Sequence, residues 1–124
     1  MRIGIDATAL PHRPVGAGNY IIQLIRALSH PTAEAHFIIF VQRHGLPLLE
    51  VKERTGFELV VLPDRRPAAR LLWEQTIFPS LAARHKLDLL HSLHYTMPLA
   101  YPGRTVVTFH DMTFFLFPGL HTLP

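Results

Sequence analysis

The sequence predicts an α/β fold: a Rossmann-like parallel sheet flanked by helices, the N-terminal half of a GT-B arrangement. Short apolar runs alternate with stretches of helical periodicity, as in strand–helix–strand units. The runs hold few polar residues, which is typical of strands covered on both faces. Loops that carry glycine and proline separate them.

Five runs are expected to be strands. The first, residues 2–6, is apolar and ends on a polar residue, Asp6. The second, residues 36–41, is the most continuous, which indicates burial between two layers. The remaining expected strands are residues 57–62, 87–91 and 105–110.

Three segments are expected to be helical. Apolar residues at helical spacing predict a helix over residues 19–29, with Pro31 just past its end. Residues 46–54 are expected to form a short helix. Residues 67–86 are expected to form a longer helix that Pro79 should kink or split, because proline lacks a backbone N–H.

Composition narrows the class of protein. The chain has 124 residues, 48% of them hydrophobic and 17% charged, which fits one domain with a packed core. It has no cysteine, which excludes disulfides and thiolate metal sites and fits the cytoplasm. The net charge of +3 is compatible with anionic substrates or the inner face of a membrane. Scattered arginines without interleaved aromatic residues argue against nucleic acid.

Four features follow the expected strands. They are the loop at residues 16–18, the turn after Leu62, residues 91–95, and His110 with Asp111. Ligands of open parallel sheets bind beyond the carboxyl ends of the strands. We therefore expect these features to open into one crevice.

Gly16, Ala17 and Gly18 lie between the first strand and the first helix. The glycines would let the backbone approach a ligand, and a helix N-terminus favours phosphate. Ile21 stands where a dinucleotide fingerprint has its third glycine, and the preceding loop is long. A simple turn explains the two glycines equally well.

His110 and Asp111 form the second candidate. An imidazole beside a carboxylate can hydrogen-bond sugar hydroxyls or transfer protons. The alternative is that Asp111 caps the next turn and His110 is the polar end of a strand. His91 and His94 suggest a metal, but their spacing suits a helix rather than a strand-to-loop junction. We expect neither a metal nor a cofactor.

The segment around Trp73 carries two further questions. Trp73 is expected to pack in the core, with Glu74 or Gln75 facing the crevice. Three arginines flank the apolar start of this helix, which suits either a solvated face or an anionic membrane surface. They are Arg65, Arg66 and Arg70.

Four segments follow one another along the chain: RIGIDA at residues 2–7, GAGNY at 16–20, RLLWEQ at 70–75, and DLLHSLHY with VVTFHD between 88 and 111. Each segment alone is a weak sequence signal, but the four segments in this order are a specific one. In these segments the chain resembles the N-terminal domain of group 1 (family 4, GT-B fold) retaining glycosyltransferases. The resemblance covers nearly the whole chain.

The resemblance implies two facing Rossmann-like domains, with the acceptor bound mainly by the first and the nucleotide sugar by the second. It implies that the backbone of Gly16, Ala17 and Gly18 lies near the donor phosphates. It also implies that His110 contacts the donor sugar, and Asp111 beside it is the other catalytic candidate. Because the family has no firmly established protein nucleophile, none is assigned here.

On the acceptor side, the resemblance implies a loop at His94 and Tyr95 that shapes the site. Asn19 and Glu74 are the other acceptor-side candidates. Family members often carry arginine where this chain has Asn19, so any charge contact from that position is missing. The family generally needs no metal.

The donor-binding second domain of that family has no counterpart within residues 1–124. We therefore expect a single, truncated acceptor-side domain, or one half of a split enzyme that docks on a partner chain through the apolar residues 114–118. The parent enzyme would transfer a sugar from a nucleotide-sugar donor to a glycan or lipid-linked acceptor with retention. The chain alone should bind donor weakly without turnover, because cationic or amide groups must stabilise the leaving group.

Two other classes of function are compatible with the sequence. The first is a non-catalytic α/β interaction module, which would fold the apolar tail back or self-associate through it. The second is a small nucleotide-binding protein. The incomplete glycine pattern and the long first loop count against that last possibility.

Overall fold

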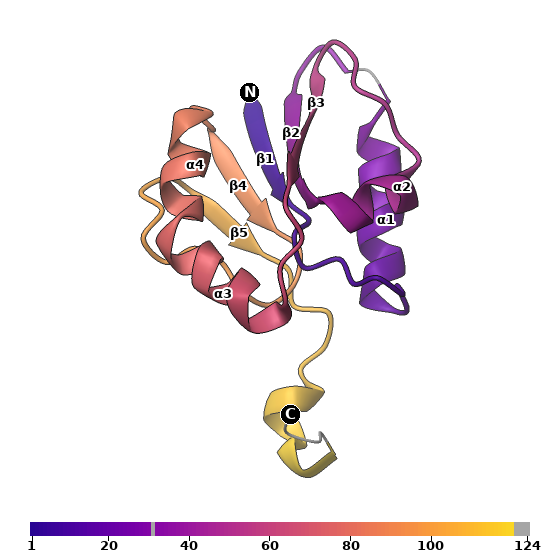
Figure 1. Ribbon diagram of the computed structural model, residues 1–124, viewed down its shortest axis with the longest axis vertical. Helices are drawn as coiled ribbons and strands as arrows, with labels where there is room; N and C mark the ends of the chain where they lie inside the picture. Colours follow the sequence, from indigo (N-terminus) through magenta and orange to yellow (C-terminus); the bar gives the residue numbers. More distant parts are fainter. Residues whose placement is uncertain (31, 121–124) are drawn as a thin grey trace.

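The computed structural model describes residues 1–30 and 32–120, and it confirms the predicted α/β class. Five strands form one sheet in the order β3-β2-β1-β4-β5, and every neighbouring pair is parallel. Helices cover both faces of the sheet (Figure 1). The strands are β1 (Arg2–Asp6), β2 (His36–Gln42), β3 (Phe57–Leu62), β4 (Leu89–Ser92) and β5 (Thr105–Val107).

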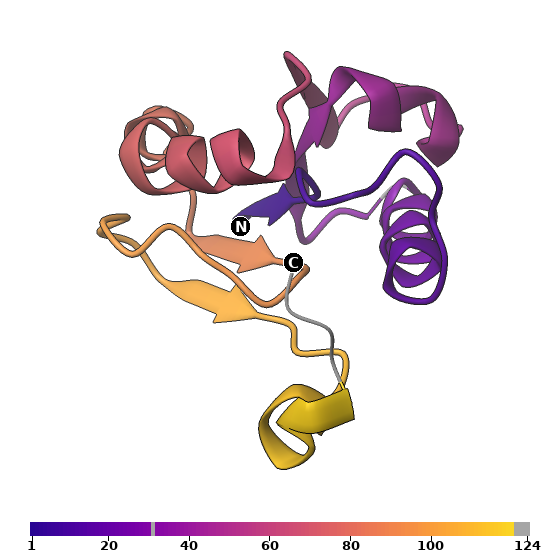
Figure 2. The same ribbon diagram turned by 60° about the horizontal axis from the view of Figure 1, so that its bottom comes forward.

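The helices form two layers. One layer holds α1 (Ala17–Leu28) and α2 (Leu46–Leu49), with the short 3₁₀ turn η1 (Arg43–Gly45) leading into α2. The opposite layer holds α3 (Pro67–Thr76) and α4 (Phe78–Arg84) (Figures 1 and 2). The last elements, α5 (Thr113–Leu116) and η2 (Pro118–Leu120), project away from the body (Figure 2).

The core has two halves, one on each face of the sheet. Side chains of β2 alternate between them: Phe37, Ile39 and Val41 pack in the half beneath α1 and α2, whereas Ile38 and Phe40 pack in the half beneath α3 and α4. The apolar run of residues 36–41 is thus buried on both faces, as predicted. This burial fixes β2 next to the central strand β1.

The proline prediction for the long helical segment is also confirmed. Helix α3 ends at Thr76, α4 begins at Phe78, and Pro79 lies in the first turn of α4. A proline is tolerated there because first-turn N–H groups have no partner within the helix. The Trp73 and Phe78 rings stack across the break, with centroids 4.7 Å apart, so Trp73 packs in the core as expected.

Several element boundaries differ from those predicted. Helix α1 begins at Ala17 rather than residue 19, and α2 ends at Leu49, where the next residue, Glu50, adopts a left-handed backbone. Strand β5 ends at Val107 rather than residue 110. Its neighbour β4 has already ended at Ser92, and the Thr108 carbonyl accepts the Tyr95 N–H of a loop instead. Pro31 lies outside the described residues.

We predict that Phe78→Ala lowers the free energy of unfolding by roughly 3–5 kcal/mol, because it empties a fully buried aromatic site in contact with Trp73 and Phe40. Leu72→Ala is the matched control. That side chain lies on the neighbouring helix and is 67% exposed, so its loss should change stability by under about 0.5 kcal/mol. Urea unfolding of the two variants would contradict this assignment of the core if their midpoints shifted equally.

Candidate functional site

The strand order locates the region where a ligand would bind. From β1 the chain winds outward to β2 and β3, then crosses back to β4 on the other side of β1. Loops that follow β1 and β4 therefore diverge at the carboxyl edge between these two strands. Open α/β sheets bind their ligands at such a switch point.

A buried polar network spans this edge. The Arg70 guanidinium on α3 donates from Nη1 to the Glu74 carboxylate (2.8 Å) and to the Thr8 hydroxyl (3.1 Å). Thr96, in the loop after β4, donates its hydroxyl to Glu74 (2.9 Å). Arg70 is only 8% exposed and Glu74 is fully buried. One ion pair thus joins α3 to the loops after β1 and β4.

Glu74 consequently has a different role from the one expected. Its carboxylate also accepts a hydrogen bond from Gln75 Nε2 (2.9 Å), which in turn donates to the Met97 carbonyl (2.8 Å). A fully buried, fully hydrogen-bonded carboxylate cannot face an acceptor molecule. Glu74 instead holds Arg70, and it is Arg70 that reaches the surface of the site.

Asp6 lies at the base of the same network. Its Oδ1 accepts the Thr8 N–H (2.9 Å) and the Thr8 hydroxyl (2.7 Å). Burial raises the pKa of the Asp6 carboxyl, although the bonds from Thr8 and the charge of Arg70 act in the opposite direction. Ser92 lies opposite Asp6 in the β1–β4 register, and its buried hydroxyl has no hydrogen-bond partner in the described part of the chain.

A cluster of imidazole and phenol rings lies beside the switch point. The His110 ring is in edge contact with Tyr20 of α1 (5.1 Å between centroids), with His94 (5.4 Å) and with Tyr95 (5.6 Å). The Leu93 carbonyl lies 2.7 Å from His110 Nε2 and can only accept, so Nε2 carries the proton. In the neutral ring, Nδ1 is then an acceptor.

The sequence candidates His94, Tyr95, His110 and Asp111 are therefore close together. Tyr95 has a left-handed backbone, with φ of 60°, which is uncommon for a residue other than glycine and recurs at ligand sites. Burial, with the neighbouring His110 and Arg70, lowers the pKa of His94. His94 is therefore a neutral imidazole at physiological pH, able to both donate and accept hydrogen bonds.

Beside these rings is a hollow of about 550 Å³. Arg70, His94, Tyr95 and Asp111 are among its lining residues. Asp111 also accepts hydrogen bonds through Oδ1 from the Thr113 N–H (3.1 Å) and hydroxyl (2.7 Å), which is the turn-capping role considered as its alternative. Its carboxylate therefore both supports the start of α5 and borders the hollow.

Local backbone conformation and packing explain the glycines in the loop before α1. Gly16 caps α1 with φ of 49°, a conformation that strains other residues. A Cβ at Gly18 would lie 2.7 Å from Pro14 Cβ, so glycine is needed there for close packing. The N–H groups of Gly18 and Tyr20 bond to the carbonyls of Val15 and Gly16. The turn accounts for both glycines; Ala17 between them is half-buried and Asn19 is exposed.

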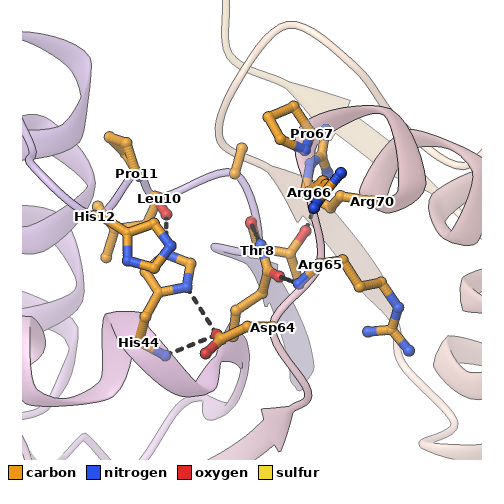
Figure 3. A pocket seen from close by; sticks show the side chains of 12 residues that line it. Thr8, Leu10, Pro11, His12, His44, Asp64, Arg65, Arg66, Pro67 and Arg70 are labelled. Carbon is orange, nitrogen blue, oxygen red and sulfur yellow. Dashed lines mark hydrogen bonds and ion pairs between the residues drawn. The ribbon is translucent and has the colours of Figure 1, made fainter.

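A second hollow, of about 460 Å³, is also lined by Arg70 (Figure 3). Three of the four predicted features therefore open into two hollows that share Arg70, rather than into one crevice, and the fourth, the loop at residues 16–18, lines neither. His12, His44 and Asp64, which line the second hollow, were not singled out from the sequence. The position of Asp64, directly after a predicted strand, was the available signal.

Comparison of the chain with known protein families, curated proteins and solved structures finds no match. No helix in the described part of the chain has both the length and the apolarity to cross a bilayer. Within residues 1–30 and 32–120, no three histidine or acidic side chains gather as metal ligands would.

We predict that Arg70→Met lowers the free energy of unfolding by roughly 3–5 kcal/mol, because it leaves the buried Glu74 carboxylate without its cation. The double variant Arg70→Met/Glu74→Met should recover most of this loss, since it removes both charges together. Chemical denaturation of the single and double variants measures the difference. A double variant less stable than the Arg70→Met single variant would contradict the assignment of Arg70 and Glu74 as a buried ion pair.

Asp6 should make stability depend on pH. Because its pKa in the folded chain is raised above the unfolded value of 3.8, the folded state binds the proton more tightly. Its ionisation therefore costs stability above the folded pKa, and this cost disappears as the pH falls to 3.8. Asp6→Asn keeps an acceptor for Thr8 without the charge.

We predict that Asp6→Asn is more stable than the wild type at pH 7 and that the gap narrows as the pH is lowered towards 4. Thermal unfolding across this range measures it. A gap that widens on acidification would mean that the Asp6 pKa is depressed instead of raised.

Proposed function

We propose that the chain is the acceptor-side domain of a retaining, nucleotide-sugar-dependent glycosyltransferase of the GT-B type. The ordered sequence segments that resemble family 4 support this, and so does the parallel α/β sheet on which they lie. The second, donor-binding domain would belong to the same protein or to a separate partner chain.

The observation that carries the proposal is the setting of His110. Its ring is held by the Leu93 carbonyl at the switch point, beside Tyr20, His94 and Tyr95. This orientation leaves Nδ1 as an acceptor for a sugar hydroxyl. Histidine and tyrosine side chains, with aromatic edges and polar tips, are well suited to a neutral, hydroxyl-rich ligand.

In the proposed reaction, the bond between the anomeric carbon and the diphosphate oxygen breaks as the acceptor oxygen bonds to the same face of the sugar, and the proton of the acceptor hydroxyl passes to the leaving diphosphate oxygen. The transition state has oxocarbenium character. His110 would orient the sugar by hydrogen bonding, and Arg70, held by Glu74, would shape the acceptor side. The diphosphate leaving group would be stabilised by the second domain, so the isolated chain should not turn over.

We predict that the 124-residue chain binds a nucleoside-diphosphate sugar weakly, with a Kd on the order of 1 mM, and that His110→Ala abolishes this binding. Saturation-transfer NMR against a panel of uridine, guanosine and adenosine diphosphate sugars measures it. His30→Ala is the matched control, because His30 is an exposed histidine after the end of α1.

Transfer of the saturation signal to the sugar protons in the wild type and in His30→Ala, but not in His110→Ala, would support the assignment. Equal signals in all three proteins, or steady sugar transfer by the isolated chain, would contradict it. A complete lack of signal would favour the interaction-module alternative.

The interaction-module alternative rests on the segment after the sheet that holds α5 and η2. Met112, Leu116, Phe117 and Leu120 are all more than half exposed, and α5 and η2 stand off from the body (Figure 2). Such a concentration of exposed apolar side chains is typical of a surface that meets another domain. In the glycosyltransferase proposal, the donor-binding domain or partner covers it; in the alternative, another protein does.

A further inference from the structure

The second hollow has the lining of an anion site. It lies beyond the carboxyl ends of β2 and β3, between the loop after β1 and the start of α3 (Figure 3). Three guanidinium groups line it, Arg65, Arg66 and Arg70, against one carboxylate, Asp64. Two of its other lining residues, Thr8 and Gln42, are buried and hydrogen-bonded into the surrounding loops.

That single carboxylate is already hydrogen-bonded to His44. Asp64 Oδ1 accepts the His44 N–H (2.9 Å) and lies 2.8 Å from His44 Nδ1. His44 Nε2 lies 2.7 Å from the Leu10 carbonyl. Each ring nitrogen of His44 therefore faces an oxygen. The backbone and side-chain hydrogen bonds from His44 lower the pKa of Asp64, so this carboxyl is ionised and hydrogen-bonded to His44.

The wall opposite the arginines is rigid. The His12 ring stacks on the His44 ring, with centroids 3.8 Å apart and planes 20° from parallel. Gln42 donates from Nε2 to the Thr8 carbonyl (2.7 Å) and accepts the Arg65 N–H through Oε1 (2.6 Å). The loops after β1, β2 and β3 are thereby tied together around the hollow.

The remaining charge in the hollow is positive. Arg70 is compensated by Glu74, and the Arg65 guanidinium points away from the histidines (Figure 3) and lies 5.0 Å above the Trp73 ring. Arg66 is exposed and makes no ion pair with a described residue. It directly precedes α3, whose first turn holds no acidic residue and adds a positive helix end.

We propose that this hollow binds a phosphate group, with Arg66 as its principal contact and Arg70 at its base. Arginine is suited to phosphate because its planar group donates two parallel hydrogen bonds. The inference goes beyond the proposed sugar transfer and does not depend on it, since it uses neither His110 nor the ring cluster. The phosphate can belong to a soluble ester or to a lipid headgroup at a membrane surface.

The first test is an NMR titration of the ¹⁵N-labelled chain with inorganic phosphate at constant ionic strength. We predict saturable shifts of amide signals from residues 8–12, 42–44 and 64–70. Arg66→Gln should weaken binding about tenfold, and Arg66→Lys should weaken it less. Arg84→Gln is the matched control, because Arg84 is an exposed arginine at the end of α4 and does not line the hollow.

The proposal is overturned if phosphate shifts no signals there, if shifts are spread over exposed arginines in general, or if Arg84→Gln weakens binding as much as Arg66→Gln. The outcome is separate from that of His110→Ala, because His110 does not line this hollow.

A second arm identifies the source of the phosphate. Glycerol 3-phosphate in the same titration represents soluble esters, and co-sedimentation with phosphatidylcholine vesicles containing phosphatidic acid represents lipid headgroups. Binding of the ester with no vesicle association supports a soluble ligand, and vesicle association that Arg66→Gln removes supports a lipid. Failure of both arms with the wild-type chain would also overturn the proposal.

Discussion

The ion pair between Arg70 and Glu74 is the contact on which the carboxyl edge of the sheet depends. Buried charges are tolerated only when paired and fully hydrogen-bonded, and here Thr8, Gln75 and Thr96 supply the remaining bonds. Because Thr8 and Thr96 come from different loops, the pair fixes α3 relative to the segments after β1 and β4. Both hollows at this edge take Arg70 as a shared wall.

The two hollows differ in chemistry although they share that wall. One is lined by aromatic rings and by the neutral imidazole of His94, which the His110 ring contacts. The other is lined by arginines and by the hydrogen-bonded pair of His44 and Asp64. A neutral hydroxyl-rich group suits the first and an anion suits the second.

The features that could be predicted from the sequence are those that depend on residues close together in the chain. The run of residues 36–41 identified a doubly buried strand, and Pro79 identified the break between α3 and α4, because each signal is local. Buried Glu74 accepts a bond from Thr96, and its partner Arg70 bonds to Thr8; both threonines lie far from residue 74 in sequence, so no pattern around it indicates this network. The His44–Asp64 pair was missed for the same reason: twenty residues separate its members.

The loop between β1 and α1 contains Pro11 and Pro14, and the Pro14 side chain packs against Gly18. Prolines restrict the unfolded chain, so less conformational entropy is lost when this loop takes its final path. The wall that the loop forms around the hollow is therefore preorganised, and the entropic cost of shaping it falls on folding rather than on association. A ligand in this hollow would therefore lose less entropy in ordering the wall than it would against a flexible loop.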